Sequence, residues 1–185
     1  PGLYAITLTG AERSFTYWRA DAAARQLASD SVALSRSLEN QALVYFSGIT
    51  LAILDDAARK TLLTAVSNAR AAGSLVAFDP NYRPRLWSRR EEAQAATVEA
   101  LAVTDIALPT FPDEQMLFGD ETPQATAERL GRQVGEVVVK NGEDPALLAI
   151  GGALRPVPAM HVAPPGDTTG AGDSFNAGHP CCLFL

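Results

Sequence analysis

The chain has 185 residues, enough for one domain with a sizeable hydrophobic core. Its formal net charge of -6, spread without a long run of like charges, argues against a nucleic-acid or an anionic-membrane partner. No apolar run reaches the length of a membrane span and no signal segment opens the chain, so we expect a cytoplasmic protein. The only cysteines, Cys181 and Cys182, are adjacent and indicate neither a disulfide framework nor a spaced metal site.

The first predicted elements are a hairpin and a helical segment. Apolar and polar residues alternate over Leu3–Thr9 and again over Ser14–Trp18, with a turn between them, which is typical of two antiparallel strands. The alanine- and leucine-rich segment Asp21–Leu38 predicts one or two helices, with Asp21 as a possible N-cap. The hairpin, within residues 1–20, is a possible appendage to the main domain.

From Leu43 onwards, short apolar runs alternate with segments of helical spacing. The predicted strands are Leu43–Phe46, Leu75–Phe78, Asp105–Leu108, Val137–Lys140, Ala146–Ile150 and Leu154–Val162. The predicted helices are Asp55–Ala72, Arg89–Leu101, Asp113–Phe118 and Pro123–Leu130. This alternation predicts an α/β fold, with a largely parallel sheet covered by helices on both faces, and residues 1–185 as a single domain. Ligands of such sheets bind at the carboxyl ends of the strands.

The most distinctive stretch is residues 167–178, Asp-Thr-Thr-Gly-Ala-Gly-Asp-Ser-Phe-Asn-Ala-Gly. The small residues Gly170, Ala171 and Gly172 let successive backbone N–H groups face one point, where the positive end of the following helix also attracts an anion. A carboxylate at Asp173 is useful there if the anion is a phosphoryl group, because it can accept the proton of the attacking hydroxyl. The alternative is a glycine-rich helix start with a capping aspartate.

This stretch resembles the D-T-x-G-A-G-D signature of the ribokinase-like (PfkB) carbohydrate kinases, and the resemblance extends from Gly2 to Gly178. It implies a kinase that uses ATP and Mg²⁺, with Asp173 as the catalytic base. It also implies an anion hole made by Gly170, Ala171, Gly172 and Asp173. Full-length members of the family are expected to form homo-oligomers through a small lid sheet, to which the opening hairpin is a possible contributor.

Two further segments resemble the 2-keto-3-deoxygluconate kinases, a branch of that family. The segment Asp79-Pro80-Asn81-Tyr82-Arg83-Pro84-Arg85-Leu86-Trp87 matches D-P-N-Y-R-P-x-L-W, which implies that Arg83 contacts a sugar acid. The hairpin exit implies that Tyr17, Trp18 and Arg19 line the sugar pocket. An arginine fork and an aromatic face suit a small anionic ligand. Taken alone, the first segment is also consistent with a solvated arginine-rich loop. The alternative for the second is an ordinary strand that packs its aromatic residues in a core.

The family resemblance also assigns residues to the nucleotide and the metal. The strand ending in Lys140, Asn141 and Gly142 lines the nucleotide site in the family, although Glu143-Asp144-Pro145 follows where another glycine is common. The other nucleotide candidates are Asn81, Thr110, Gly170 and Gly172. Glu114 is the candidate for holding Mg²⁺ through water, although Phe111 stands where the family has asparagine, and Asp113 is expected to be a solvated helix cap.

The predicted reaction is ATP-dependent phosphorylation of 2-keto-3-deoxygluconate to 2-keto-3-deoxy-6-phosphogluconate. A fructokinase or ribokinase acting on a neutral sugar is the alternative enzyme, and a truncated, inactive remnant is the alternative from another class. The remnant is considered because the chain starts at Pro1 and Pro180 is expected to stop the last helix after two turns, with residues 179–185 as an atypical tail. A P-loop is absent, and His161 and His179 offer little to a histidine-based hydrolase.

Overall fold

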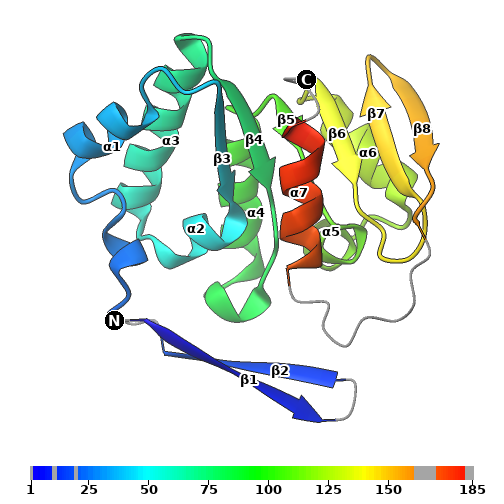
Figure 1. Ribbon diagram of the computed structural model, residues 1–185, viewed down its shortest axis with the longest axis horizontal. Coiled ribbons are helices and arrows are strands. Elements are labelled where there is room, and N and C mark those ends of the chain that lie inside the picture. Colours follow the sequence, from blue (N-terminus) through cyan, green and yellow to red (C-terminus); the bar gives the residue numbers. More distant parts are fainter. Residues whose placement is uncertain (1, 10–11, 19–20, 161–169, 182–185) are drawn as a thin grey trace.

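The computed structural model describes residues 2–9, 12–18, 21–160 and 170–181 (Figure 1). Most of these residues form an α/β unit built on a six-stranded sheet, and the opening hairpin forms a separate two-stranded sheet. Within the described residues, none of the helices combines the length and the apolar character that a membrane span requires.

The central sheet has the strand order β3-β4-β5-β6-β7-β8, so every strand lies beside its neighbour in sequence. The first four strands are parallel, and β7 and β8 are each antiparallel to the strand before them. The prediction of a largely parallel sheet is therefore confirmed. The strands are β3 (Leu43–Ser47), β4 (Leu75–Asp79), β5 (Ile106–Ala107), β6 (Glu136–Val139), β7 (Ala146–Ile150) and β8 (Ala153–Val157).

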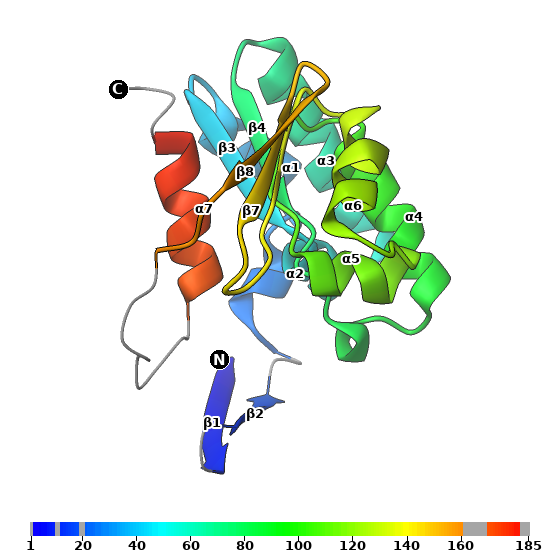
Figure 2. The same ribbon diagram turned by 90° about the vertical axis from the view of Figure 1, so that its right-hand side faces the viewer.

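Helices cover both faces of this sheet, but unequally. Figure 2 shows α3, α4, α5 and α6 on one face and α7 on the other. Right-handed crossovers between consecutive neighbouring strands place their helices on the same face, which explains the larger group. The helices are α1 (Ser31–Leu38), α2 (Gly48–Ile53), α3 (Asp56–Ala71), α4 (Arg90–Leu101), α5 (Phe111–Phe118), α6 (Pro123–Gly131) and α7 (Ala171–Cys181). Two short 3₁₀ helices are η1 (Ala23–Gln26) and η2 (Pro84–Leu86).

The main core lies between the sheet and the larger group of helices. Alternate strand residues such as Val76 and Phe78 are fully buried there, and the rings of Phe46 and Phe78 lie 4.7 Å apart. A smaller apolar cluster, which includes Ala77 and Leu108, is separate from it. Successive side chains of a strand point to opposite faces, so this second cluster belongs to the face that carries α7.

Several local details differ from the sequence expectations. Asp30, not Asp21, caps the first α-helix, because its carboxylate accepts hydrogen bonds from the backbone N–H groups of Val32 and Ala33. Helix α2 was not expected and follows β3 directly. Helix α7 continues to Cys181 rather than stopping before Pro180, so only one residue of the helix follows the proline. The hairpin is confirmed, with β1 (Leu3–Thr9) antiparallel to β2 (Glu12–Trp18).

Candidate active site

Four polar side chains meet on the α7 face of the sheet, where parallel strands end. Asp79 is the last residue of β4, Lys140 directly follows β6, Tyr45 belongs to β3 and Asn176 to α7. The Nζ of Lys140 donates hydrogen bonds to Asp79 Oδ2 and to Asn176 Oδ1, both at 2.8 Å. The amide Nδ2 of Asn176 donates to Asp79 Oδ2 at 2.6 Å and to the Tyr45 hydroxyl at 3.2 Å. These bonds connect α7 with three strands.

This network is buried at its centre and reaches the surface at Tyr45. Asp79, Lys140 and Asn176 are 2%, 8% and 4% exposed, whereas Tyr45 is 44% exposed. Burial raises the pKa of Tyr45, the carboxylates of Asp79 and Asp173 raise it further, and the hydrogen bond with Asn176 opposes them. Asp173 therefore lies within electrostatic reach of the network.

The loop after β4 is held in an unusual conformation. Asp79 Oδ1 accepts a hydrogen bond from the backbone N–H of Asn81 at 3.0 Å, and Asn81 has a φ of 37°. Positive φ is uncommon outside glycine, but asparagine tolerates it better than most residues. Gly48, at the start of α2, lies so close to this loop that a Cβ built on it would be 1.8 Å from the carbonyl oxygen of Pro80. The backbone of this loop is thus fixed from two sides.

Arg83 and Asp113 form an ion pair beside this loop. Arg83 Nη1 donates to Asp113 Oδ2 at 3.2 Å and to the carbonyl oxygen of Tyr82 at 2.8 Å, and about half of the arginine side chain is exposed. Burial raises the pKa of Asp113, whereas the Arg83 guanidinium opposes that rise. The expectation of a solvated helix cap at Asp113 is wrong, because Thr110 is the N-cap of α5 and the Asp113 carboxylate is mostly enclosed.

Glu114 points to a different part of the molecule. Its side chain is completely buried, and its Oε2 accepts a hydrogen bond of 2.7 Å from Nη2 of Arg129 in α6. Burial raises the pKa of Glu114 to about 7, although Arg129 favours the charged form. Its other oxygen, Oε1, is buried without a hydrogen-bond partner among the described residues, and the role of Glu114 in holding Mg²⁺ through water stays a prediction. Of the two neighbouring acids, Asp113 lies in reach of Asp79 and Lys140.

The start of α7 has the backbone expected of an anion site. Gly170 has a φ of 79°, which favours glycine, and its carbonyl oxygen accepts a hydrogen bond from the Ser174 N–H at 2.8 Å. Ala171, Gly172 and Asp173 form the first turn and are exposed. The amides of this first turn lie at the N-terminus of the helix and carry its partial positive charge. Asp167, Thr168 and Thr169 of the motif lie outside the described residues.

A pocket of about 440 Å³ gathers most of the nucleotide candidates. Thr110, Lys140, Asn141, Gly142 and Gly172 all line it. Thr110 and Lys140 lie side by side in a parallel β-bridge. The Lys140 N–H donates to the carbonyl of Pro109, and the Phe111 N–H donates to the carbonyl of Lys140, both at 2.8 Å. The rest of the lining is mainly apolar and includes Ala146, Val157, Ala159, Met160 and Phe175. Neither Asn81 nor Gly170 is among the lining residues.

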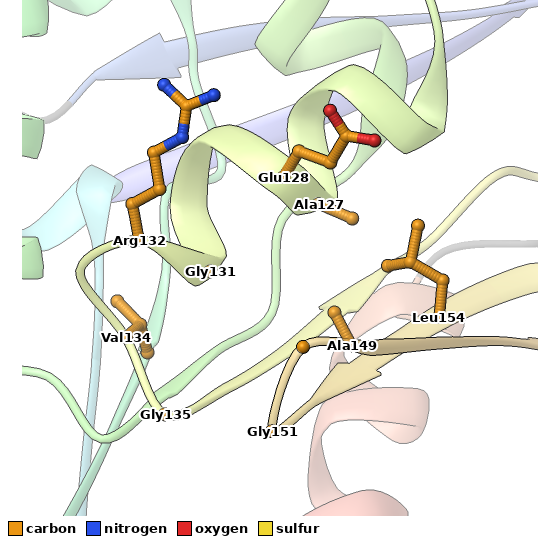
Figure 3. Close-up of a pocket in the computed structure, with 10 residues that line it drawn as sticks. Ala127, Glu128, Gly131, Arg132, Val134, Gly135, Ala149, Gly151 and Leu154 are labelled. Carbon is orange, nitrogen blue, oxygen red and sulfur yellow. The ribbon is translucent and has the colours of Figure 1, made fainter.

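A second pocket, of about 340 Å³, lies between α6 and the turn that joins β7 to β8 (Figure 3). Small residues such as Gly131, Gly135 and Gly151 line it, and Figure 3 shows the charged ends of Glu128 and Arg132 extending away from the Gly151 turn. None of the predicted site residues belongs to it.

The hairpin residues predicted to contact a sugar are described only in part. Figures 1 and 2 place the hairpin beyond the carboxyl edge of the sheet, on the side where α7 begins. Trp18 is more than half exposed. Arg19 lies outside the described residues, and for Tyr17 the structure describes the backbone strand only.

Residues 1–181 match the pfkB family of carbohydrate kinases. The 2-dehydro-3-deoxygluconokinase of Dickeya dadantii is 47% identical over 186 residues, which cover 97% of this chain and 60% of that protein. The chain thus spans about 60% of the length of this curated relative.

Two solved structures are similar over nearly the whole chain. The PfkB protein of Polaromonas sp. JS666 gives a TM-score of 0.80 at 28% identity, covering 98% of this chain and 59% of that chain. The proposed ribokinase II of Escherichia coli, in complex with ATP and Mg²⁺, gives a TM-score of 0.77 at 27% identity, covering 97% and 57%. The sheet order, the glycine-rich start of α7 and the match over residues 1–181 agree, and the chain belongs to the pfkB family of carbohydrate kinases.

Proposed function

We propose that this chain provides the catalytic part of a kinase that transfers the γ-phosphoryl group of ATP to 2-keto-3-deoxygluconate, forming 2-keto-3-deoxy-6-phosphogluconate. The observation that carries the proposal is the position of the α7 N-terminus. Ala171 and Gly172 of its first turn line the 440 Å³ pocket, and Asp173 is the next residue of that turn. The identity of 47% to a 2-dehydro-3-deoxygluconokinase supports the choice of substrate.

In this proposal, the first turn of α7 supplies both the amides that bind the phosphoryl group and the catalytic base, Asp173. The amides of Gly170, Ala171 and Gly172 stabilise the charge on the transferring phosphoryl group. Asp173 accepts the proton of the attacking hydroxyl, which demands little basicity because phosphoryl transfer passes through a loose transition state. The pocket walls at Thr110 and Lys140 hold the phosphate chain near that turn, and the apolar lining faces the base of the nucleotide.

Mg²⁺ fits this site only as a partner of the nucleotide. Within the part of the chain that the structure describes, no group of three or more His, Cys, Asp or Glu side chains could hold a metal ion. Mg²⁺ usually retains several waters and binds through phosphates and one or two carboxylates, so such a cage is not required. When bound, the ion neutralises charge on the phosphates. Asp173 is exposed in the first turn of α7, whereas Glu114, the carboxylate that the resemblance implies for its waters, is buried.

Arg83 is the proposed contact for the carboxylate of the sugar acid. One of its terminal nitrogens is bound to Asp113 and to the backbone, and about half of the side chain remains exposed. A planar guanidinium can bind a carboxylate with two parallel hydrogen bonds. Tyr17, Trp18 and Arg19 remain proposed contacts on the hairpin side.

We also propose a homo-oligomer formed through the hairpin, in a cytoplasmic protein without nucleic-acid or membrane partners. The exposed fractions of Leu3, Tyr4 and Trp18 are 62%, 54% and 55%. Large apolar residues gathered on a small sheet are typical of a surface that another chain covers.

The experiment is a kinase assay with two proteins, the purified chain and a chimera. In the chimera, this chain replaces the matched 186 residues of the Dickeya dadantii relative. We expect the chimera to consume ATP with 2-keto-3-deoxygluconate and much more slowly with fructose or ribose. Activity with a neutral sugar alone would favour the fructokinase or ribokinase alternative, and no activity with any sugar would favour the inactive remnant.

Two variants of the chimera test the assigned roles. Asp173→Asn should lower kcat by roughly 10²–10⁴-fold, because it removes the proton acceptor. Arg83→Ala should raise KM for the sugar acid without changing KM for ATP, since it removes a charged hydrogen bond made in the ground state as well. Full turnover by Asp173→Asn would contradict the mechanism, and an unchanged KM in Arg83→Ala would contradict the carboxylate contact.

A further inference from the structure

Helix α7 makes polar contacts with the sheet and the strand ends at Asn176 and His179. In residues 170–179, whose side chains the structure describes, Asn176 is the only fully buried residue. Phe175, the largest apolar side chain of this segment, is more than one-third exposed. Near the other end of the helix, His179 pairs with Glu136 of β6. Among these described side chains, the buried one therefore holds the helix by directional bonds rather than by apolar packing.

Asn176 supplies most of those bonds. Its carbonyl oxygen accepts from Lys140 Nζ, and its amide nitrogen donates to Asp79 Oδ2 and to the Tyr45 hydroxyl. An amide with defined partners for both ends resists rotation and sliding of the helix, because either movement leaves a buried polar group without its bond. Asp79 and Lys140 are themselves a buried ion pair, so each requires the other to stay in place.

The network lies one helical turn from the proposed catalytic base. Asn176 is three residues after Asp173, and residues with this spacing lie on the same face of a helix. Fixing Asn176 therefore fixes both the Asp173 carboxylate and the amides of Gly170 to Gly172. For reacting groups, a displacement of about 1 Å can cost on the order of 10²-fold in rate.

We propose that Asp79, Lys140 and Asn176 are positioning residues, which together hold the start of α7 at the distance from the strand ends that phosphoryl transfer requires. The inference rests on the proposed function, because the quantity that it controls is the rate of that transfer. It also gives the Lys140 ammonium group a different role from the nucleotide contact that the family resemblance implies. In the structure this group is bonded to Asp79 and Asn176, whereas Lys140 still forms part of the pocket wall.

The first test uses the chimera with Asn176→Leu, which keeps the side-chain volume and removes the amide bonds. We expect kcat to fall by roughly 10²-fold while KM for the sugar acid changes by less than about 3-fold, the signature of a lost transition-state geometry. Asn68→Leu, at an exposed position of α3, is the matched control and should leave both parameters unchanged. A wild-type kcat in Asn176→Leu overturns the proposal.

A second variant covers the case in which Asn176→Leu fails to fold. The double substitution Asp79→Asn with Lys140→Met removes both buried charges, so no ion is left without its partner. It should fold and still lose kcat by at least about 10-fold, because α7 has lost two anchors. The control pair Asp56→Asn with Lys60→Met, both exposed on α3, should retain wild-type kcat. A folded double variant with wild-type kcat also overturns the proposal.

Hydrogen exchange separates this proposal from the proposed function. In the purified chain, Asn176→Leu should speed exchange of the α7 amides from Ser174 to Ala177 and leave the α3 amides unchanged. If no form of the chimera phosphorylates any sugar, the proposed function fails, and exchange alone decides whether the network holds α7. If the chimera is active but exchange in α7 is unaffected by Asn176→Leu, the network does not position the helix and the proposal is overturned.

Discussion

Replacing Lys140 by methionine should destabilise the protein far more than replacing an exposed lysine. Methionine keeps most of the length of the lysine side chain, but it leaves the carboxylate of Asp79 without its cation, and Asp79 is only 2% exposed. Removing one partner of a buried ion pair costs roughly 3–5 kcal/mol. Asp79 keeps hydrogen bonds from Asn81 N–H and Asn176 Nδ2, which favours the lower end, about 3 kcal/mol. For a chain of this length, that corresponds to a fall of roughly 10 °C in Tm.

The measurement is urea unfolding at pH 7, followed by circular dichroism, with Lys60→Met as the control. The control should change the free energy of unfolding by less than about 0.5 kcal/mol, since Lys60 is exposed. A double-mutant cycle that adds Asp79→Asn isolates the contribution of the ion pair. We expect the double variant to lose about 1–3 kcal/mol less stability than the sum of the two single-variant losses. A loss below about 1 kcal/mol in Lys140→Met, or strict additivity in the cycle, would refute the reasoning.

Two further predictions concern other buried positions. Burial, opposed by Arg129, raises the pKa of Glu114 from 4.5 to about 7. The folded state therefore binds the Glu114 proton more tightly than the unfolded state does. The stabilisation that results is fully present below pH 4.5 and is lost as the pH rises to 7. Between pH 5 and pH 8, wild type should therefore lose about 2–3 kcal/mol more stability than Glu114→Gln in urea unfolding, and parallel losses would contradict this. Gly48→Ala would place its Cβ 1.8 Å from the Pro80 carbonyl oxygen and should cost about 3 kcal/mol or more, whereas Gly131→Ala, with open space at its Cβ, should be neutral or slightly stabilising. Equal unfolding midpoints for the two glycine variants would show that the loop can yield.

The strands and the long helices could be predicted from hydrophobic pattern, because burial on one or both faces leaves a period in the sequence. Helix α3 illustrates this, since its buried residues Leu62, Val66 and Ala69 repeat at helical spacing. Helix α2 lacked such a signal, because it begins at Gly48, immediately after a strand, where glycine usually marks a turn. The cap of the first α-helix was misplaced because Asp21 and Asp30 both precede helix-forming residues, and only the fold decides between them.

The site was predictable to the extent that strand ends gather in one place. Thr110 follows β5, Lys140 and Asn141 follow β6, and all three line one pocket, as the rule for parallel sheets requires. The pairing of Asp79, Lys140 and Asn176 was not predictable, because these residues lie on three elements and each also has an ordinary local interpretation. Asn176 carried one usable signal, its position one turn after Asp173 in the glycine-rich motif.

The choice between two adjacent acids depended on where a helix begins. The sequence predicts a helix from Asp113, whereas α5 begins at Phe111. Successive residues of a helix are rotated by about 100°, so its phase decides which acid faces the strand ends and which faces α6. The structure directs Asp113 to Arg83 and Glu114 to Arg129. Neighbouring carboxylates thus have separate partners, one on the loop after β4 and one on α6.

The sequential order of β3 to β6 has a consequence for how this protein assembles. Each of these strands pairs with the next one along the chain, and the connecting helices gather on one side. Contacts between segments close in sequence form quickly, because little chain entropy is lost in closing the loops. Residues 43–139 can therefore acquire their layered structure before the glycine-rich segment docks on the opposite side. The groups proposed for chemistry would then arrive last during folding and leave first during unfolding, so the protein could lose its reactive centre while most of its structure persists.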